Sequence, residues 1–137
     1  MLDTNVLVAA LRSPHGASAA LISAVPSPIW TPVLSVPLYV QYQDVLLRPG
    51  MIPATLTRED ILAFCRYLAS ISHLQEIYFL WRPHLRDEGD DMVFEVAVAA
   101  EARYIITHNV RDFVGATEFG VTPMRPAEFL ILTRRSS

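Results

Sequence analysis

Residues 86–113 read RDEGDDMVFEVAVAAEARYIITHNVRDF, and the order of residue types along this segment predicts the architecture of the chain. Four of residues 87–91 are carboxylates, and an apolar helical pattern follows them. The apolar strand 104–107 comes next and is followed by a polar turn that contains Asn109 and Asp112. A helix that leads into a parallel strand brings the residues after that strand to the carboxyl edge of a sheet, where open α/β sheets hold their sites.

The first residues of the chain form a similar polar group. Asp3, Thr4 and Asn5 precede an apolar run, residues 6–11. A carboxylate beside an apolar run is costly to bury unless it is paired or bound to a metal. We therefore expect Asp3 to end a short strand and to meet the polar turn of residues 107–112. A central strand needs about five residues, so the first strand is either shortened or begins upstream of Met1.

The composition is that of a globular protein. At 137 residues, the chain is long enough to bury a core and short enough for one domain, so we expect residues 1–137 to form a single domain. Hydrophobic residues make up 52% of the chain, which excludes a disordered protein. No apolar run is long enough to span a membrane, and we expect no secretory leader because Asp3 lies at the very start of the sequence.

Cysteine content and net charge restrict the expected compartment and partners. The single Cys65 can form no internal disulfide and lies in an apolar helical pattern. We therefore expect a buried thiol in a reducing, cytoplasmic environment. The net charge of −3 gives no general attraction to nucleic acid, although a bound cation could supply positive charge locally.

Helical and strand patterns alternate along the rest of the chain. The expected helices cover residues 6–11, 17–24, 36–47, 57–70, 91–102 and 125–130. The expected strands cover residues 29–35, 76–80, 104–107 and 120–124, and residues 114–119 are expected to form a surface loop. Ser35 and Thr57 fit the N-caps of two of these helices. Alternation of this kind predicts an α/β fold, a three-layer α/β/α sandwich around a central, mostly parallel sheet.

Three carboxylates fall where such a fold would bring them together. Asp3 and Asp112 follow strands, and Asp91 opens the helix before the last buried strand. Hard divalent cations such as Mg²⁺ prefer oxygen ligands, usually carboxylates completed by water and phosphate. The neutral side chains that would hold these carboxylates in place are Thr4, Thr107 and Asn109.

Each carboxylate also has a simpler interpretation. The acidic residues 87–91 suit the positive end of a helix, and Asp112 suits a turn. Asp3 is harder to explain without a partner, because an unpaired carboxylate is costly to bury. The metal-site hypothesis therefore depends on all three residues lying on compatible elements.

The residues also carry a family resemblance. The segment LDTNVLV, residues 2–8, resembles the opening motif of PIN domains, which are metal-dependent ribonucleases. Segments that resemble the family in order and spacing are residues 35–46, 86–91, 104–107, 112–113 and 126–130. The resemblance covers essentially the whole chain. It is closest to the single-domain toxin components of prokaryotic toxin–antitoxin pairs, the VapC-like branch.

The resemblance implies an α/β/α sandwich and an endoribonuclease that depends on Mg²⁺ or Mn²⁺. It implies metal ligation by Asp3, Asp91 and Asp112, with Asn109 as a further catalytic residue. The residues implied to support the site are Thr4, Asn5 and Thr107. The implied partners are an RNA substrate, a cognate antitoxin protein and a second copy of the chain in a homodimer, and no membrane is implied.

The chain departs from the family pattern at two positions. The family has a glutamate in the acidic set just before a tyrosine, whereas this chain has Gln41 before Tyr42. An amide keeps one oxygen acceptor but loses the charge, although Asp44 on the same helical face could substitute. The branch also often has aspartate where this chain has Asn109. An alternative function is therefore a catalytically weak PIN-like protein that acts by binding RNA or a partner.

Several other residues have two interpretations each. His108 lies beside the proposed site and could contact substrate phosphate, or could be an ordinary surface residue. Leu38, Val45 and Leu46 could form part of a dimer face or of the core. The arginines that could flank an RNA groove, or be merely solvated, are Arg12, Arg48, Arg82, Arg86 and Arg111.

Overall fold

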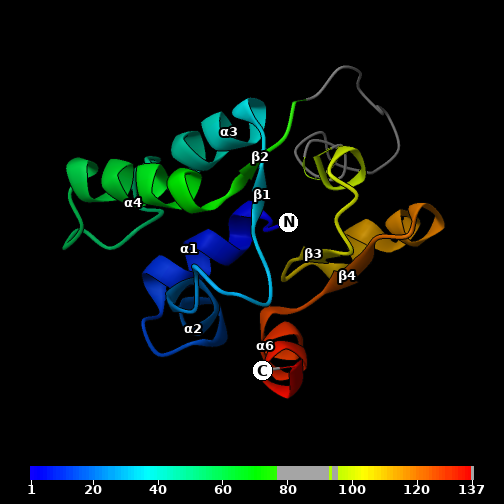
Figure 1. Ribbon diagram of the computed structural model, residues 1–137. Coiled ribbons are helices and arrows are strands. Elements are labelled where there is room, and N and C mark those ends of the chain that lie inside the picture. The colour runs from blue at the N-terminus through cyan, green and yellow to red at the C-terminus, as the bar shows by residue number, and fades with distance from the viewer. Residues whose placement is uncertain (77–92, 94–95, 137) are drawn as a thin grey trace.

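The computed structural model describes residues 1–76, 93 and 96–136, and these residues form helices and short parallel strands (Figure 1). The helices are α1 (Thr4–Arg12), α2 (Ala17–Ser23), α3 (Val36–Leu46), α4 (Arg58–Ile71), the 3-10 helix η1 (Val110–Phe119) and α6 (Pro126–Ser136). The strands are β1 (Val33–Leu34), β2 (His73–Leu74), β3 (Tyr104–Ile106) and β4 (Thr122–Met124). Residues 93 and 96–99 are also helical. The fold is therefore α/β, as the sequence predicts.

All strand pairs in the described residues are parallel. β1 pairs with β2, and β3 pairs with β4. Leu2 forms a further parallel bridge with Ile106. The N–H of Ile106 donates to Met1, whereas the N–H of Thr107 donates to Met124, so the first strand and β4 lie on opposite edges of β3. The residues that follow Leu2 and β3 consequently meet at one edge of the sheet.

Side-chain caps explain where three helices begin. Asp3 caps α1, and the Ser35 hydroxyl accepts from the N–H of Leu38 in α3, each satisfying an N–H that the helix leaves unpaired. Thr57 and Asp60 form a reciprocal capping box at α4, in which each side chain accepts from the other residue's N–H. The N-caps predicted at Ser35 and Thr57 are confirmed.

The helices pack around one apolar core. α1 contacts α2 and α3, α3 lies beside α4, and α2 contacts α6 (Figure 1). Leu38, Tyr42 and Leu46 form the buried face of α3. Leu38 and Leu46 therefore belong to the core and offer no surface for a dimer. Cys65 of α4 is also buried, and burial raises the pKa of its thiol.

Three expectations about element boundaries are wrong, and a fourth lies mostly outside the described residues. Residues 114–119 belong to η1 instead of a loop, and η1 ends at Gly120 in the left-handed conformation. Within the expected strand 29–35, only β1 forms ladder pairs. A strand that the sequence did not predict, β2, lies at His73–Leu74. The expected strand 76–80 stays a prediction, because residues 77–80 fall outside the described residues. The terminal helix α6 continues to Ser136.

The segment η1 is kinked at Phe113, whose backbone is non-helical with φ −114° and ψ 16°, so η1 consists of two short helical pieces. Phe113 at the kink and Ala116 beyond it are both fully buried, and they anchor η1 on the core. Among the described residues, no helix combines the length and apolar character needed to cross a bilayer.

Candidate functional site

Asp3 lies at the point where the first strand becomes helix α1. Its backbone N–H donates to the carbonyl of Ile106 at 2.9 Å, which ends the pairing with β3. Its Oδ1 accepts from the N–H of Thr4 at 2.8 Å, and its Oδ2 accepts from the hydroxyl of Thr107 at 2.7 Å. The residue is only 7% exposed. Both carboxylate oxygens are thus held in a fixed orientation, and the positive end of α1 favours their charge.

Thr107 is the centre of the hydrogen-bond network around Asp3. This fully buried residue follows β3 directly. Its hydroxyl donates to Asp3 and accepts from the N–H of Asn109 at 3.0 Å and from Nδ2 of Asn5 at 3.3 Å. A hydroxyl has one donor and two acceptor positions. All three are used, so the proton must point at the carboxylate.

Asn5 and His108 extend this network to helix α2. The Oδ1 of Asn5 accepts from the N–H of His108 at 3.2 Å, while its Nδ2 donates to Thr107. The two bonds together fix the orientation of the amide. The Nε2 of His108 lies 2.9 Å from the hydroxyl of Ser18, which is buried in α2. Hydrogen bonds therefore hold the turn of residues 107–109 from α1 and from α2.

Helix α3 contacts the first strand through Tyr42. The buried Tyr42 hydroxyl donates to the carbonyl of Leu2, the residue before Asp3. Burial, and then the nearby charge of Asp3, raise the pKa of Tyr42 well above its ordinary value of 10.0. Tyr42 is therefore a neutral hydrogen-bond donor at neutral pH.

Gln41, beside Tyr42, occupies the position where the family resemblance leads one to expect a glutamate. Its Oε1 is buried and has no hydrogen-bond partner within the described part of the chain, and the same is true of Oγ1 of Thr4. Buried polar atoms without partners are uncommon and call for an explanation, such as a bound ion or water. Asp44 does not replace the missing carboxylate, because it is exposed and pairs with Arg48 at 2.9 Å on the helix surface.

Asp112 and Asp91 are the two remaining carboxylates of the predicted metal site. Asp112 is half-buried in the first turn of η1, where its N–H donates to the carbonyl of Asn109 at 3.0 Å. Its carboxylate accepts no hydrogen bond within the described residues. Asp91 falls outside those residues. In residues 1–76, 93 and 96–136, no group of three His, Cys, Asp or Glu side chains could hold a metal ion.

The structure thus brings together part of the predicted site. Hydrogen bonds join Asp3, Thr4, Asn5, Thr107 and Asn109. Asp112 bonds to Asn109 through its backbone N–H alone, and the Oε1 of Gln41 on α3 has no hydrogen-bond partner among the described residues. Sequence reasoning missed Ser18, since nothing distinguishes it from the other small residues of α2. It also missed the role of Tyr42, although its position next to Gln41 could have pointed to it.

Comparison with known proteins agrees with this geometry. The family model described as PIN domain matches residues 1–111, a range that includes Asp3 and the whole network around Thr107 and ends one residue before Asp112. No curated protein and no solved structure matches the chain. PIN domains are in general nucleases and use divalent metal ions. Because the match spans most of the chain, the protein belongs to the PIN-domain family.

Proposed function

We propose that the protein is an endoribonuclease that depends on Mg²⁺ or Mn²⁺ and that Asp3 is its central metal ligand. The observation that carries this proposal is the carboxylate of Asp3, which is almost fully buried yet held by two hydrogen bonds at the carboxyl edge of the sheet. A carboxylate held in place by partners in this way is suited to metal ligation, because outer hydrogen bonds orient a ligand.

The chemistry of the surrounding donors fits a hard divalent cation. Thr4 and Gln41 each have a buried oxygen atom without a partner among the residues described. Oxygen ligands are those that Mg²⁺ and Mn²⁺ prefer. In the proposed site Asp3, Asp91 and Asp112 hold the ion, and Asn109 completes the polar surroundings. When bound, the ion lowers the pKa of a coordinated water and neutralises charge on the phosphate.

The chain's own residues prepare the site. Thr107 donates to Oδ2 of Asp3 and so fixes the direction of the carboxylate. The backbone N–H of Thr4 and the positive end of α1 favour the charged form of Asp3. Tyr42 remains neutral and keeps Leu2 in place through its carbonyl. The result is a pre-oriented negative group at the sheet edge, next to exposed His108 and Asn109, where a phosphate backbone could approach.

We also propose that residues 1–137 act as one domain and that the protein is the toxin of a toxin–antitoxin pair, with an antitoxin and a homodimer as its protein partners. The resemblance to VapC-like proteins supports this proposal. A nuclease that cleaves the RNA of its own cell needs a partner that blocks it. An antitoxin arginine that pairs with the carboxylates of the site would supply such a block through charge-assisted hydrogen bonds.

The decisive experiment compares the wild-type protein with Asp3→Asn on single-stranded RNA in the presence of Mg²⁺ or Mn²⁺. Asparagine caps a helix about as well as aspartate, so the variant removes the charge and keeps the start of α1. We expect cleavage to fall by more than about 100-fold, because loss of an outer partner alone costs a metal site about 10–100-fold and this variant removes the charge of the ligand itself. Thermal unfolding of both proteins controls for folding. Equal cleavage by both would identify a contaminant and overturn the proposal.

A second candidate function is binding of RNA or of a partner by a catalytically weak protein. The buried Oε1 of Gln41 favours it, because an amide oxygen offers an acceptor but no charge to a cation. Gln41→Glu distinguishes the two functions. If the site is weakened, this variant binds Mn²⁺ more tightly and cleaves RNA faster than the wild-type protein. An active wild-type protein that gains nothing from the substitution would exclude this second candidate.

A further inference from the structure

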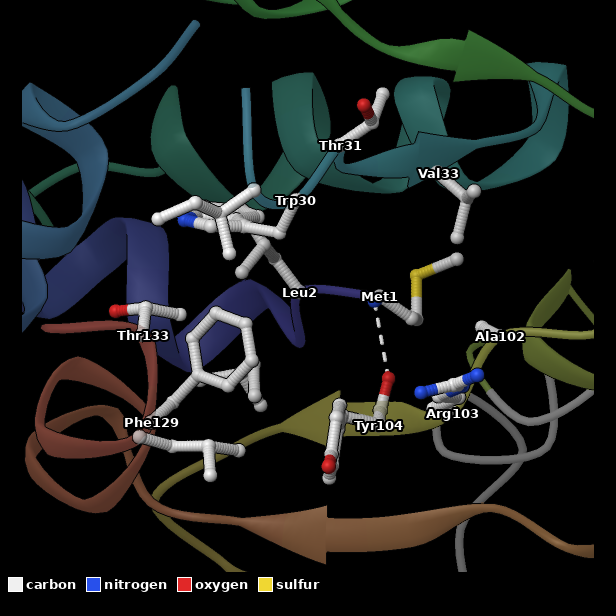
Figure 2. A pocket seen from close by; sticks show the side chains of 13 residues that line it. Met1, Leu2, Trp30, Thr31, Val33, Ala102, Arg103, Tyr104, Phe129 and Thr133 are labelled. Atoms are coloured by element: carbon white, nitrogen blue, oxygen red, sulfur yellow. Dashed lines mark hydrogen bonds between the residues drawn. The ribbon is translucent and has the colours of Figure 1, made fainter. Parts of the chain in front are cut away.

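A cavity of about 460 Å³ lies at the opposite end of the strand pair from Asp3. Figure 2 shows Met1 at its centre and the rings of Trp30 and Phe129 at one end, where they meet edge to face with centroids 5.2 Å apart. The walls are predominantly apolar, and Arg103 is the one charged side chain among the described residues that line it. An RNA backbone carries a charge on every nucleotide and needs donors along its path, so this cavity does not suit it. The polar residues at the carboxyl edge of the sheet suit it better.

His108 lies at this carboxyl edge and is exposed. Its backbone N–H donates to Asn5 of α1 at 3.2 Å, and its Nε2 lies 2.9 Å from the hydroxyl of Ser18 in α2. Ser18 is only 3% exposed, so the ring is held against a buried group. The other ring nitrogen, Nδ1, makes no hydrogen bond within the described residues. A ligand that approaches the edge from solvent therefore meets a fixed ring with one nitrogen available.

The hydroxyl of Ser18 determines what that nitrogen can do. A hydroxyl can donate one hydrogen bond and accept two, so Ser18 can serve either tautomer of the ring. When Ser18 donates to Nε2, the proton of a neutral imidazole resides on Nδ1. Nδ1 is then a donor for an anionic oxygen without any charge on the ring. A neutral donor beside the proposed divalent cation avoids the repulsion that a second cation would face.

Preorganisation distinguishes His108 from the arginine nearest to it in the sequence. Arg111 is also exposed, and it makes no ion pair within the described residues. An RNA would have to immobilise this long side chain, which costs side-chain entropy. The ring of His108 is already held by Ser18, and its backbone by Asn5, so a contact with phosphate loses less entropy there. A single hydrogen bond from His108 can therefore contribute measurably to RNA affinity.

We propose that His108 is a substrate-binding residue, which donates a hydrogen bond from Nδ1 to a phosphate oxygen of the RNA backbone beside the metal site. Thr107, the residue before it, donates to Asp3, so the phosphate donor and the proposed metal ligand belong to one hydrogen-bond network. This network sets where the RNA chain lies relative to the ion. The proposal rests on the proposed function, from which it takes RNA as the ligand.

The first test measures binding of a fluorescently labelled single-stranded RNA by anisotropy, once in EDTA and once with Ca²⁺. We expect His108→Ala to raise Kd by about tenfold, the lower end of what loss of one hydrogen bond to a charged group causes. His73→Ala is the matched control and should leave Kd unchanged, because the exposed ring of His73 also bonds to one side chain, Gln75, but lies on β2. Equal Kd values for His108→Ala and the wild type, or no binding by the wild type in either solution, would overturn the proposal.

Two conservative variants test which ring nitrogen contacts the RNA. His108→Asn places its amide nitrogen near the position of Nδ1 and gives up the contact with Ser18, whereas His108→Gln reaches the position of Nε2 and can keep that contact. We expect His108→Asn to stay within about threefold of the wild-type Kd and His108→Gln to lose about as much affinity as His108→Ala. The reverse order would show that the contact with Ser18 supports RNA binding in place of Nδ1, and would contradict the proposal.

Two RNAs of different sequence separate a phosphate contact from a base contact. A phosphate contact carries no sequence information, so His108→Ala should weaken the binding of oligo(U) and of oligo(A) by the same factor. A loss confined to one of the two RNAs, or binding fully retained by His108→Phe, would show that the ring stacks on a base. Either result would overturn the assignment of a phosphate to Nδ1.

Kinetics separate this proposal from the nuclease function on which it rests. In RNA cleavage, His108→Ala should raise KM by about tenfold and leave kcat within about threefold, because a contact made equally in the ground state and the transition state changes KM alone. Mn²⁺ affinity should be unchanged. A fall in kcat or in Mn²⁺ affinity without a change in KM would show that His108 orients the Asp3 site, and would overturn the proposal. RNA binding that depends on His108 in a protein that cleaves no RNA would contradict the nuclease function and leave the phosphate contact standing.

Discussion

The two ends of the strand pair formed by Leu2 and Ile106 each bury a group that can carry charge, but they surround it differently. At the carboxyl end, Asp3 is 7% exposed and receives hydrogen bonds from the N–H of Thr4 and the hydroxyl of Thr107. Two further bonds fix the orientation of that hydroxyl. At the amino end, the Met1 nitrogen has the single acceptor Tyr104 among the described residues and borders an apolar cavity.

This difference determines whether a buried group stays charged at each end of the strand pair. A buried charge is tolerated where fixed donors replace the water it has lost, and it is neutralised where they do not. The surroundings of Asp3 therefore favour a negative charge, as a metal ligand requires. The surroundings of Met1 favour a neutral nitrogen, because burial lowers the pKa of its ammonium group. Four predictions test this contrast, in order of decreasing effect.

The largest effect is expected from pH at the amino end. The pKa of the Met1 ammonium falls from 8.0 in the unfolded chain to about 5 in the folded one, a difference of about 3. The unfolded chain therefore binds the extra proton between pH 8 and pH 5, so stability is fully present above pH 8 and is lost as pH falls through 5. The loss is at most about 4 kcal/mol. Urea unfolding of the chain that begins at Met1, measured at pH 8 and pH 5, gives this difference.

N-terminal acetylation is the control for this effect. It removes the titrating group and leaves every carboxylate and histidine unchanged, so the difference between acetylated and free chains isolates Met1. We expect the acetylated chain to lose less stability between pH 8 and pH 5. Identical pH profiles for the two chains would mean that the ammonium group reaches water in the folded state, and the contrast between the two ends would then fail.

The second prediction concerns Thr107, at the carboxyl end. Thr107→Val keeps the shape of the side chain but removes the donor to Asp3 and the acceptor for Asn5 and Asn109. Leaving such groups unsatisfied should lower the free energy of unfolding by about 2–3 kcal/mol. Loss of the orientation of Asp3 should also lower metal-dependent RNA cleavage by about 10–100-fold. Thr107→Ser keeps the hydroxyl and should retain most of both, and an equal loss in both variants would contradict the role of the hydroxyl.

The carboxyl end was largely predictable from the sequence. Polar residues that follow two parallel strands must meet at one edge, so the proximity of Asp3 and Thr107 follows from the order of elements alone. Local signals also placed the caps at Ser35 and Thr57, because a cap depends on residues within one turn. The metal set of Asp3, Asp91 and Asp112 stays a prediction.

The parts that were not predictable depend on contacts between distant residues. Ser18 reaches His108 across 90 positions, and no local pattern marks Ser18 as the partner of that ring. The short strand β2 forms where His73 and Gln75 find carbonyls of β1, although exposed His73 and Leu74 show no strand-like alternation. The kink within η1 lies at the fully buried Phe113, and propensity alone does not encode it.

The third prediction concerns Tyr42→Phe. Tyr42 contacts Leu2, which lies between Met1 and Asp3. The substitution removes the donor to the Leu2 carbonyl and leaves that buried acceptor unpaired, which should cost about 1–2 kcal/mol of stability. Tyr39→Phe on the same helix is a matched control, because the half-buried Tyr39 hydroxyl only accepts from Gln43 and should cost less. Thermal unfolding of both variants measures the difference. A larger cost for Tyr39→Phe would contradict the role assigned to Tyr42.

The smallest effect is expected at the outer limit of the network, for Ser18→Ala. The hydroxyl of Ser18 is the partner of the His108 ring, which is exposed and can bond to water instead. The lost hydrogen bond, about 1 kcal/mol, is partly offset by the better helix propensity of alanine, so the net cost should stay below about 1 kcal/mol. Ser23→Ala, at an exposed position of the same helix, controls for propensity alone.

This last variant also measures how independent the Asp3 site is of its surroundings. Asn5 and Thr107 hold the turn of residues 107–109 without Ser18, through bonds to the backbone of His108 and Asn109. We therefore expect RNA cleavage by Ser18→Ala to remain within about threefold of the wild-type rate, a barrier change of less than about 1 kcal/mol. A loss as large as that of Thr107→Val would show that His108 orients the site itself. The orientation of the Asp3 site would then depend on the single contact between Ser18 and His108, just as the Met1 nitrogen depends on the Tyr104 carbonyl.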